Sequence, residues 1–253
     1  MINNPTNAQI AELNADSLKA NPVNNDPHKK IRNMNDGWLL TPNKLEQLKI
    51  IYPGCKNEQS LNDYRELRTK LLQASDDKNF VCMVSAISPK SGTSHVALNL
   101  AASIALDNSK TALVIDCNSY APSLHNYLQK KSQLGLSNFL EEDVQEIEDI
   151  IYPIGIPRIR VIPSGVKTEH APENFSSEKM KKFIEKVKNR YPDRFIILDT
   201  PPAALYVESQ ILASVCDMAI LVVPYGEATA SQIQTGIELI SSDKLVGIVL
   251  NNK

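Results

Sequence analysis

The sequence has no excess of basic residues, no paired-cysteine motif and no long apolar run. Its 27 Lys and Arg are outnumbered by 29 Asp and Glu, which gives a formal net charge of −2 over 253 residues. The lack of a basic excess to neutralise phosphates argues against nucleic-acid binding as the main function. The four cysteines stand far apart, so we expect buried free thiols: Cys55, Cys82, Cys117 and Cys216.

The sequence also lacks the features of a secreted or membrane-spanning protein. Its first residues do not show the charged and then apolar pattern of a signal peptide. The longest uncharged apolar run, 218–224, is too short to span a bilayer. We therefore expect a cytoplasmic protein, in which any association with a membrane passes through a partner.

The chain divides into a polar N-terminal segment and one larger domain. Residues 1–36 are rich in Asn, Asp, Lys and Pro and have few large apolar side chains, so we predict a disordered tail. The remaining 37–253 are expected to form one domain, because 42% of the chain is apolar. The apolar patch at 38–51 is expected to pack onto that domain, and 62–73 has the period of an amphipathic helix.

From residue 80 onward, strand-like and helix-like segments alternate. Several strands are apolar without alternation, as expected when helices cover both faces of a sheet. This order predicts an α/β fold, a doubly wound and mainly parallel sheet of the P-loop NTPase type, with ligands at the carboxyl ends of the strands. The expected strands are 80–87, 111–115, 159–162, 194–198, 218–223 and 246–250, and the expected helices between them are 96–106, 135–142, 177–191, 208–214 and 229–240.

The loop after the first strand resembles a phosphate-binding loop that has lost its lysine. The motif GxxxxGK[ST] uses backbone N–H groups and a lysine to hold phosphates, and a hydroxyl to bind magnesium. Gly92 and Ser94 match its second glycine and its hydroxyl, but Thr93 stands where the lysine belongs. Together with Lys90 and Ser91 these residues form the candidate nucleotide-binding loop. The motif alone does not identify a P-loop.

Two expected strands end in aspartate, at Asp116 and Asp199. A carboxylate at the tip of an apolar strand, beside a phosphate loop, is placed to hold magnesium or its waters. An aspartate can also simply cap the turn that follows a strand. The occurrence of two such strand ends in one sheet favours the metal site, with Ser94 as its third member.

An ordered set of segments makes the sequence resemble a known family. The loop at 88–94 is followed by IDCN at 115–118, PSLH at 122–125, VIPSG at 161–165, DRFIILDTPP at 193–202 and GIVLNNK at 247–253. This order resembles bacterial tyrosine autokinases of polysaccharide export, which belong to the MinD/ParA-like P-loop ATPases. Within them the chain looks closest to the short, soluble kind associated with exopolysaccharide and exosortase gene clusters. The resemblance covers about 60–253.

The resemblance implies ligands, partners and site residues. It implies ATP or ADP with Mg2+, an inner-membrane polysaccharide co-polymerase or chain-length determinant as partner, and a role in regulating polymer assembly. The family's second catalytic Asp falls on Asn118, so Asp116 and Asn118 make a degenerate catalytic pair. Its self-association helix places Asn62, Arg65 and Arg68 at an interface between copies of the chain. Kinases of this family also end in a tyrosine cluster, whereas no tyrosine follows Tyr225 in this sequence.

These departures leave three hypotheses open. Loss of the lysine removes a charge that offsets the charge developing on the transferred phosphoryl group, and Asn118 cannot accept a proton. Both favour a pseudo-enzyme that regulates exopolysaccharide synthesis, with nucleotide and Mg2+ binding weakened or lost. The second hypothesis is an active ATP-dependent kinase or ATPase that uses Lys90 in place of the missing lysine. The third is a structural subunit that keeps only the fold.

Overall fold

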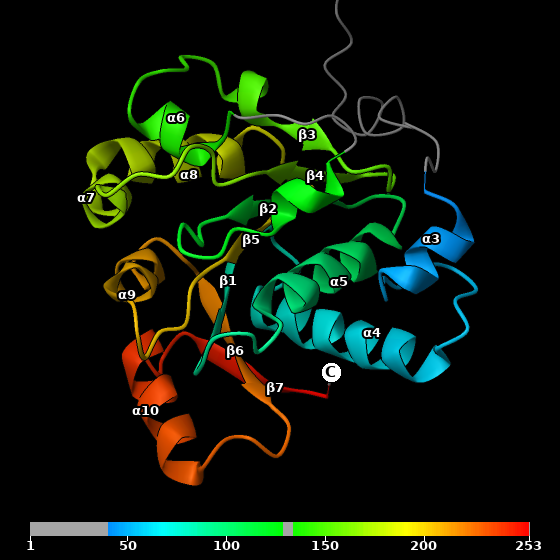
Figure 1. The fold of residues 1–253 in the computed structure, drawn as a ribbon. Coiled ribbons are helices and arrows are strands. Elements are labelled where there is room, and N and C mark those ends of the chain that lie inside the picture. The colour runs from blue at the N-terminus through cyan, green and yellow to red at the C-terminus, as the bar shows by residue number, and fades with distance from the viewer. Residues whose placement is uncertain (1–39, 129–133, 253) are drawn as a thin grey trace, which may run out of the picture.

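A seven-stranded sheet forms the centre of the protein (Figure 1). The computed structural model describes residues 40–128 and 134–252. In these residues the order across the sheet is β3-β4-β2-β5-β1-β6-β7, and every neighbouring pair is parallel except β3 with β4. The strands are β1 (Val81–Ala86), β2 (Thr111–Asp116), β3 (Tyr152–Pro153), β4 (Ile159–Ile162), β5 (Arg194–Asp199), β6 (Met218–Pro224) and β7 (Leu245–Asn251).

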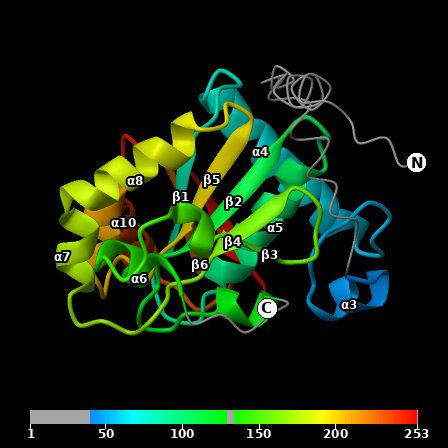
Figure 2. The ribbon, with the colours of Figure 1, turned by 90° about the horizontal axis from the view of Figure 1, so that it is seen from above.

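Helices cover both faces of this sheet, and each layer has its own apolar core (Figure 2). The first layer contains α3 (Pro42–Gln47), α4 (Glu58–Ala74) and α5 (Thr93–Ala105). The second contains α6 (Leu136–Leu140), η2 (Ile147–Ile150), α7 (Ala171–Ser176), α8 (Glu178–Asn189), α9 (Val207–Ala213) and α10 (Ala230–Ile240). A short 3-10 helix, η1 (Leu124–Tyr127), follows β2. Because both faces are covered, β1, β2, β5 and β6 are buried along their whole length.

The predicted fold class is confirmed, and every strand and helix expected from the sequence is present. Leu45, Ile50 and Ile51 are buried in the first layer, as expected of the apolar patch. The other patch residues at 38 and 39, and the predicted tail at 1–36, lie outside the described residues. All four cysteines are free and buried. No helix in the described ranges is long and apolar enough to cross a membrane.

Five short elements were not expected: β3, α3, α7 and the 3-10 helices η1 and η2. Strand β3 has only two residues, too few to show an alternation of apolar and polar side chains. It also includes Pro153, which has no N–H to donate to the neighbouring strand. Helices α3 and α7 have six residues each, too few for a helical period to stand out. Both have proline in the first turn, where a missing N–H costs least.

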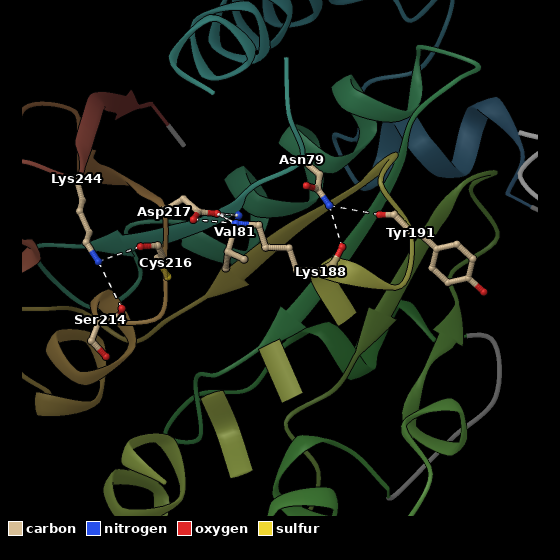
Figure 3. Close-up of polar contacts among 8 residues, drawn as sticks. All are labelled: Asn79, Val81, Lys188, Tyr191, Ser214, Cys216, Asp217 and Lys244. Carbon is tan, nitrogen blue, oxygen red and sulfur yellow. Dashed lines mark hydrogen bonds and ion pairs between the residues drawn. The ribbon is translucent and has the colours of Figure 1, made fainter. Parts of the chain in front are cut away.

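Polar contacts join several strands at their amino ends (Figure 3). The predicted site lies at the opposite, carboxyl ends of the strands. Asp217, just before β6, accepts a hydrogen bond from the backbone N of Val81 at 2.7 Å. Its two carboxylate oxygens also lie 2.9 and 2.7 Å from Nζ of Lys188, at the end of α8. Nearby, Nζ of Lys244 donates to the carbonyl oxygen of Cys216 at 3.0 Å. These contacts fix β1, β6, β7 and α8 relative to one another.

We expect Asp217→Ala to lower the free energy of unfolding by about 1–3 kcal/mol, because the buried N–H of Val81 loses its acceptor. Urea denaturation measures the change. The matched control is Glu66→Ala, which removes the exposed ion pair between Glu66 and Lys70 on α4. Equal losses in the two variants would show that the Asp217 contacts do not hold the strands together.

Candidate functional site

The loop between β1 and α5 has two residues in the left-handed region, Lys90 at φ 60° and Gly92 at φ 89°. Buried Ser91 braces the turn, since its hydroxyl donates to the carbonyl oxygen of Ser88 at 2.7 Å. Asn251, the last residue of β7, donates from Nδ2 to the carbonyl oxygen of Ser91 at 2.8 Å. A Cβ atom at position 92 would lie 2.3 Å from this same Nδ2 atom. The close approach and the backbone angle therefore both require glycine at position 92.

Helix α5 begins directly after this loop and presents unpaired backbone N–H groups to it. Gly92 is the N-cap residue, and no side chain caps the helix. The thirteen-residue helix therefore directs free N–H groups and the positive end of its dipole toward the strand ends. Thr93 and Ser94, its first two residues, are half-buried. An anion can bind at this point without the lysine, but it meets no fixed positive charge from position 93.

Lys90 lies in the loop but is not held toward the helix. Its side chain is exposed, and in the described part of the chain no ion pair or hydrogen bond holds its Nζ. Its ammonium group is thus free to move.

Asp116 and Asp199 end neighbouring parallel strands and stand opposite each other in the β2–β5 register. Both are fully buried. The backbone N of Asn118 donates to Oδ1 of Asp116 at 3.1 Å, and those of Ser123 and Leu124 donate to Oδ2, also at 3.1 Å. These bonds stabilise the charged form. They oppose burial, the larger effect, which raises the pKa of Asp116.

Asp199 has no comparable support. In the described ranges neither of its carboxylate oxygens has a hydrogen-bond partner. Burial raises its pKa, and the charge of Asp116 raises it further. The hydroxyls of Ser94 and Thr93 are near enough to act in the opposite direction, although neither has hydrogen-bond geometry. A buried carboxylate left without a partner calls for a cation.

Magnesium fits this arrangement. Mg2+ is usually bound by one or two carboxylates together with phosphate oxygens and waters, and not by a cage of protein ligands. Asp199 offers two free oxygens, with the hydroxyl of Ser94 nearby and Asp116 on the adjacent strand. In the described residues no cluster of three or more His, Cys, Asp or Glu forms a separate metal site.

Asn118 has a structural contact of its own. Its Oδ1 accepts from the backbone N of Ala121 at 3.1 Å, which shapes the loop after β2. Asn118 is buried beside Asp116. A carboxylate in its place would keep the acceptor and add a negative charge next to the two aspartates.

A cavity of about 610 Å3 adjoins the loop, on the side of α4 and β7. None of the loop residues 88–94 lines it, but it is lined by His95, which follows Ser94, and by Asn251, whose amide binds the Ser91 carbonyl. Lys49 and Ile51 line its α3 side. Its volume is in the range of small-molecule sites in proteins. No role was predicted for these residues. Asn251 lies in the GIVLNNK segment and His95 directly follows the loop at 88–94, but Lys49 and Ile51 come from a part of the chain where no motif indicated a role.

The predicted interface residues share α4 but differ in their surroundings. Asn62 and Arg65 are exposed, and Nη1 of Arg65 lies 3.5 Å from Oδ1 of Asn62. Arg68 is half-buried, and its Nη1 donates to the carbonyl oxygen of Ser103 on α5 at 2.8 Å. Arg68 therefore already has a contact within the protein, whereas Asn62 and Arg65 face outward.

Comparison with known proteins shows the family. A model described as "AAA domain" matches residues 84–246. The tyrosine-protein kinase CpsD of Streptococcus agalactiae is 28% identical over 210 residues, which cover 82% of this chain and 90% of the relative. The chain belongs to the bacterial tyrosine autokinase family of P-loop ATPases.

Solved structures of the family and of its wider fold agree with this assignment. The kinase domain of the Escherichia coli tyrosine kinase ETK superposes with a TM-score of 0.70 at 25% identity, covering 76% of this chain and 75% of the ETK chain. The septum site-determining protein MinD from Pyrococcus horikoshii, solved with Mg-ADP, has a TM-score of 0.54 at 23% identity, covering 68% of this chain and 69% of its own. The second likeness supports the fold alone. The family resemblance predicted from the sequence is confirmed.

Proposed function

We propose that the protein is a degenerate, kinase-like member of this family that regulates exopolysaccharide biosynthesis and export without efficient phosphotransfer. The observation that carries the proposal is Thr93 at the first position of α5, beside the carboxylate pair of Asp116 and Asp199. The scaffold for binding is present, but the positive charge that stabilises phosphoryl transfer is absent. Such preorganised charge is usually the largest contribution to catalysis.

Binding of a nucleotide with magnesium is part of this proposal. The left-handed glycine, the uncapped helix, the unpartnered Asp199 carboxylate and the adjoining cavity all support it. The affinity is expected to be weaker than in relatives with a complete loop, because one phosphate contact is missing. We further propose that an inner-membrane polysaccharide co-polymerase, a chain-length determinant, reads the nucleotide-bound state. The family resemblance supports this partner.

An active kinase or ATPase that uses Lys90 is the second candidate. The exposed Lys90 ammonium has no partner in the described residues, so it can move over the phosphates. Calorimetry with ATP or ADP and Mg2+, together with a phosphotransfer assay, separates the two. Micromolar binding without turnover supports the regulator. Turnover that disappears in Lys90→Ala would establish the active kinase. If no nucleotide binds at millimolar concentration, only the structural subunit that keeps the fold remains.

We also propose that the exposed face of α4 joins copies of the chain. We expect Arg65→Glu to reduce the oligomer in sedimentation velocity without changing the melting temperature, because Arg65 is exposed. Arg68→Glu is expected to destabilise the fold itself, since it breaks the bond to the Ser103 carbonyl. If Arg65→Glu leaves the oligomer size unchanged, this interface is wrong.

A further inference from the structure

Lys49 occupies the turn between α3 and α4, close to the first turns of α5. Its backbone is left-handed, with φ 53°. Its carbonyl oxygen accepts from Nδ2 of buried Asn99 on α5 at 3.2 Å. Oδ1 of the same Asn99 accepts from the backbone N of Ile51 at 2.8 Å. The buried side-chain amide of Asn99 on α5 therefore fixes the backbone that carries Lys49.

The position of Lys49 places its charge beside the N-terminal turn of α5. Lys49 and His95 line the same cavity, and His95 directly follows Ser94. Burial lowers the pKa of His95, and the positive charge of Lys49 lowers it further. Both side chains therefore face the same cavity near the start of α5. Lys90 does not line the cavity, and neither does any other residue of the loop at 88–94.

The acidic side chains around this cavity already have partners. Glu46 accepts from the Tyr52 hydroxyl and from the backbone N of Lys56. Glu66 pairs with Lys70 at 2.7 Å, and Asp63 accepts from Gln59. Within the described ranges, no acidic group is paired with the exposed Lys49 ammonium. Lys49 therefore brings a positive charge to the cavity without a fixed counter-ion.

We propose that Lys49 binds a phosphate group of a nucleotide in this cavity and supplies, from outside the loop, positive charge that Thr93 does not. The inference rests on the nucleotide binding proposed above and names a residue for it. The ammonium is a flexible donor of three hydrogen bonds, suited to phosphate oxygens. It lies on the His95 side of the loop. It stands apart from the first position of α5, and therefore does not restore the charge at position 93.

Titration calorimetry with Mg2+ and ATP, ADP or adenosine tests the proposal. In Lys49→Gln we expect roughly tenfold weaker binding of ATP and ADP, as for loss of one charge-assisted hydrogen bond, and unchanged binding of adenosine. Lys49→Arg should bind within about twofold of the wild type, since it keeps the charge. Lys44→Gln is the matched control, because Lys44 is an exposed lysine on α3 that does not line the cavity. Melting temperatures should be equal in all four proteins.

A second measurement needs no variant. Lysines are acetylated with a limiting amount of an amine-reactive acetylating reagent, and the modified residues are identified by mass spectrometry. When ATP and Mg2+ are present, Lys49 should be protected from acetylation and Lys44 should not. If the wild type binds ATP but Lys49→Gln binds equally well, and Lys49 is not protected, this inference fails and nucleotide binding stands. If the wild type binds no ATP, the proposed nucleotide binding fails and the role of Lys49 with it.

Discussion

Phosphotransfer should appear, or rise by at least about 100-fold, when Thr93 is replaced by lysine. Thr93 begins α5, so the new ammonium would stand at the helix N-terminus next to Ser94 and Asp199. Removing one preorganised donor from an active site typically lowers the rate by about 100- to 1000-fold, and restoring one should give a comparable gain. Transfer of 32P from ATP to the protein, or release of ADP, measures the effect.

Two further variants show whether charge is the cause. Thr93→Met adds a side chain of similar length without charge and should stay inactive. Thr93→Lys combined with Asn118→Asp should be more active than Thr93→Lys alone, because the carboxylate can accept a proton and still accept from the Ala121 N–H. If Thr93→Lys turns over no faster than Thr93→Met, the missing lysine is not what limits the protein. If the wild type already transfers phosphate at the rate of Thr93→Lys, the protein is no pseudo-enzyme.

The second large effect is expected from Asp199→Asn, and it should have opposite signs with and without ligand. Without ligand, the variant removes a buried carboxylate that has no partner in the described residues, so the free energy of unfolding should rise by about 1–3 kcal/mol. For a chain of this size that is roughly 2–12 °C in melting temperature. With ATP and Mg2+ the wild type should gain stability, by about 2.7 kcal/mol at a ligand concentration 100 times Kd, and the variant little or none.

The stability gain in Asp199→Asn should depend on pH. Because the folded pKa of Asp199 is raised above its ordinary value of 3.8, the folded protein holds a proton that the unfolded chain has released. Wild-type stability is therefore lost as the pH rises from about 4 through the folded pKa. The variant should match the wild type near pH 4 and exceed it above pH 8.

Asp107→Asn is the matched control for this experiment. Partial burial acts to raise the pKa of Asp107, but hydrogen bonds from the backbone N and the hydroxyl of Ser109 outweigh it and lower the pKa to about 2. Its substitution should therefore reduce stability above pH 4, the opposite sign to Asp199→Asn. A stabilising effect of both would point to net charge, and not to the burial of Asp199.

Much of the fold could be predicted because the signals are local. Strands such as β5 are unbroken apolar runs that end in aspartate, and a parallel sheet brings those ends together at one edge. Asp116 and Asp199 were therefore expected at strand ends of one sheet, and in the structure they end neighbouring strands. The sequence could not show that Asp199 lacks a partner whereas Asp116 accepts three backbone hydrogen bonds, because that difference comes from the path of the loop at 117–124.

The cavity could not be predicted for a similar reason. Lys49 lies 46 residues before His95, and Asn251 lies 156 residues after it, so the three belong to no common motif. They meet because the amide of Asn99 fastens the α3–α4 turn to α5, and because β7 lies at the sheet edge beside α4. Lys90 was considered as a replacement lysine because it is near Thr93 in the sequence. Lys49 is far from Thr93 in the sequence, and only the fold brings it into the same cavity as His95.

The contact between Gly92 and Asn251 has a consequence for how the sequence can evolve. Any side chain at 92 would collide with the Asn251 amide, and a larger residue at 251 would press on the loop that the amide now braces. Because the left-handed backbone disfavours a side chain at 92 whatever stands at 251, a change at 251 cannot compensate for a change at 92. An alignment of near relatives should show glycine kept at 92 and no residue larger than asparagine at 251, even in lineages that have lost the lysine next to that glycine.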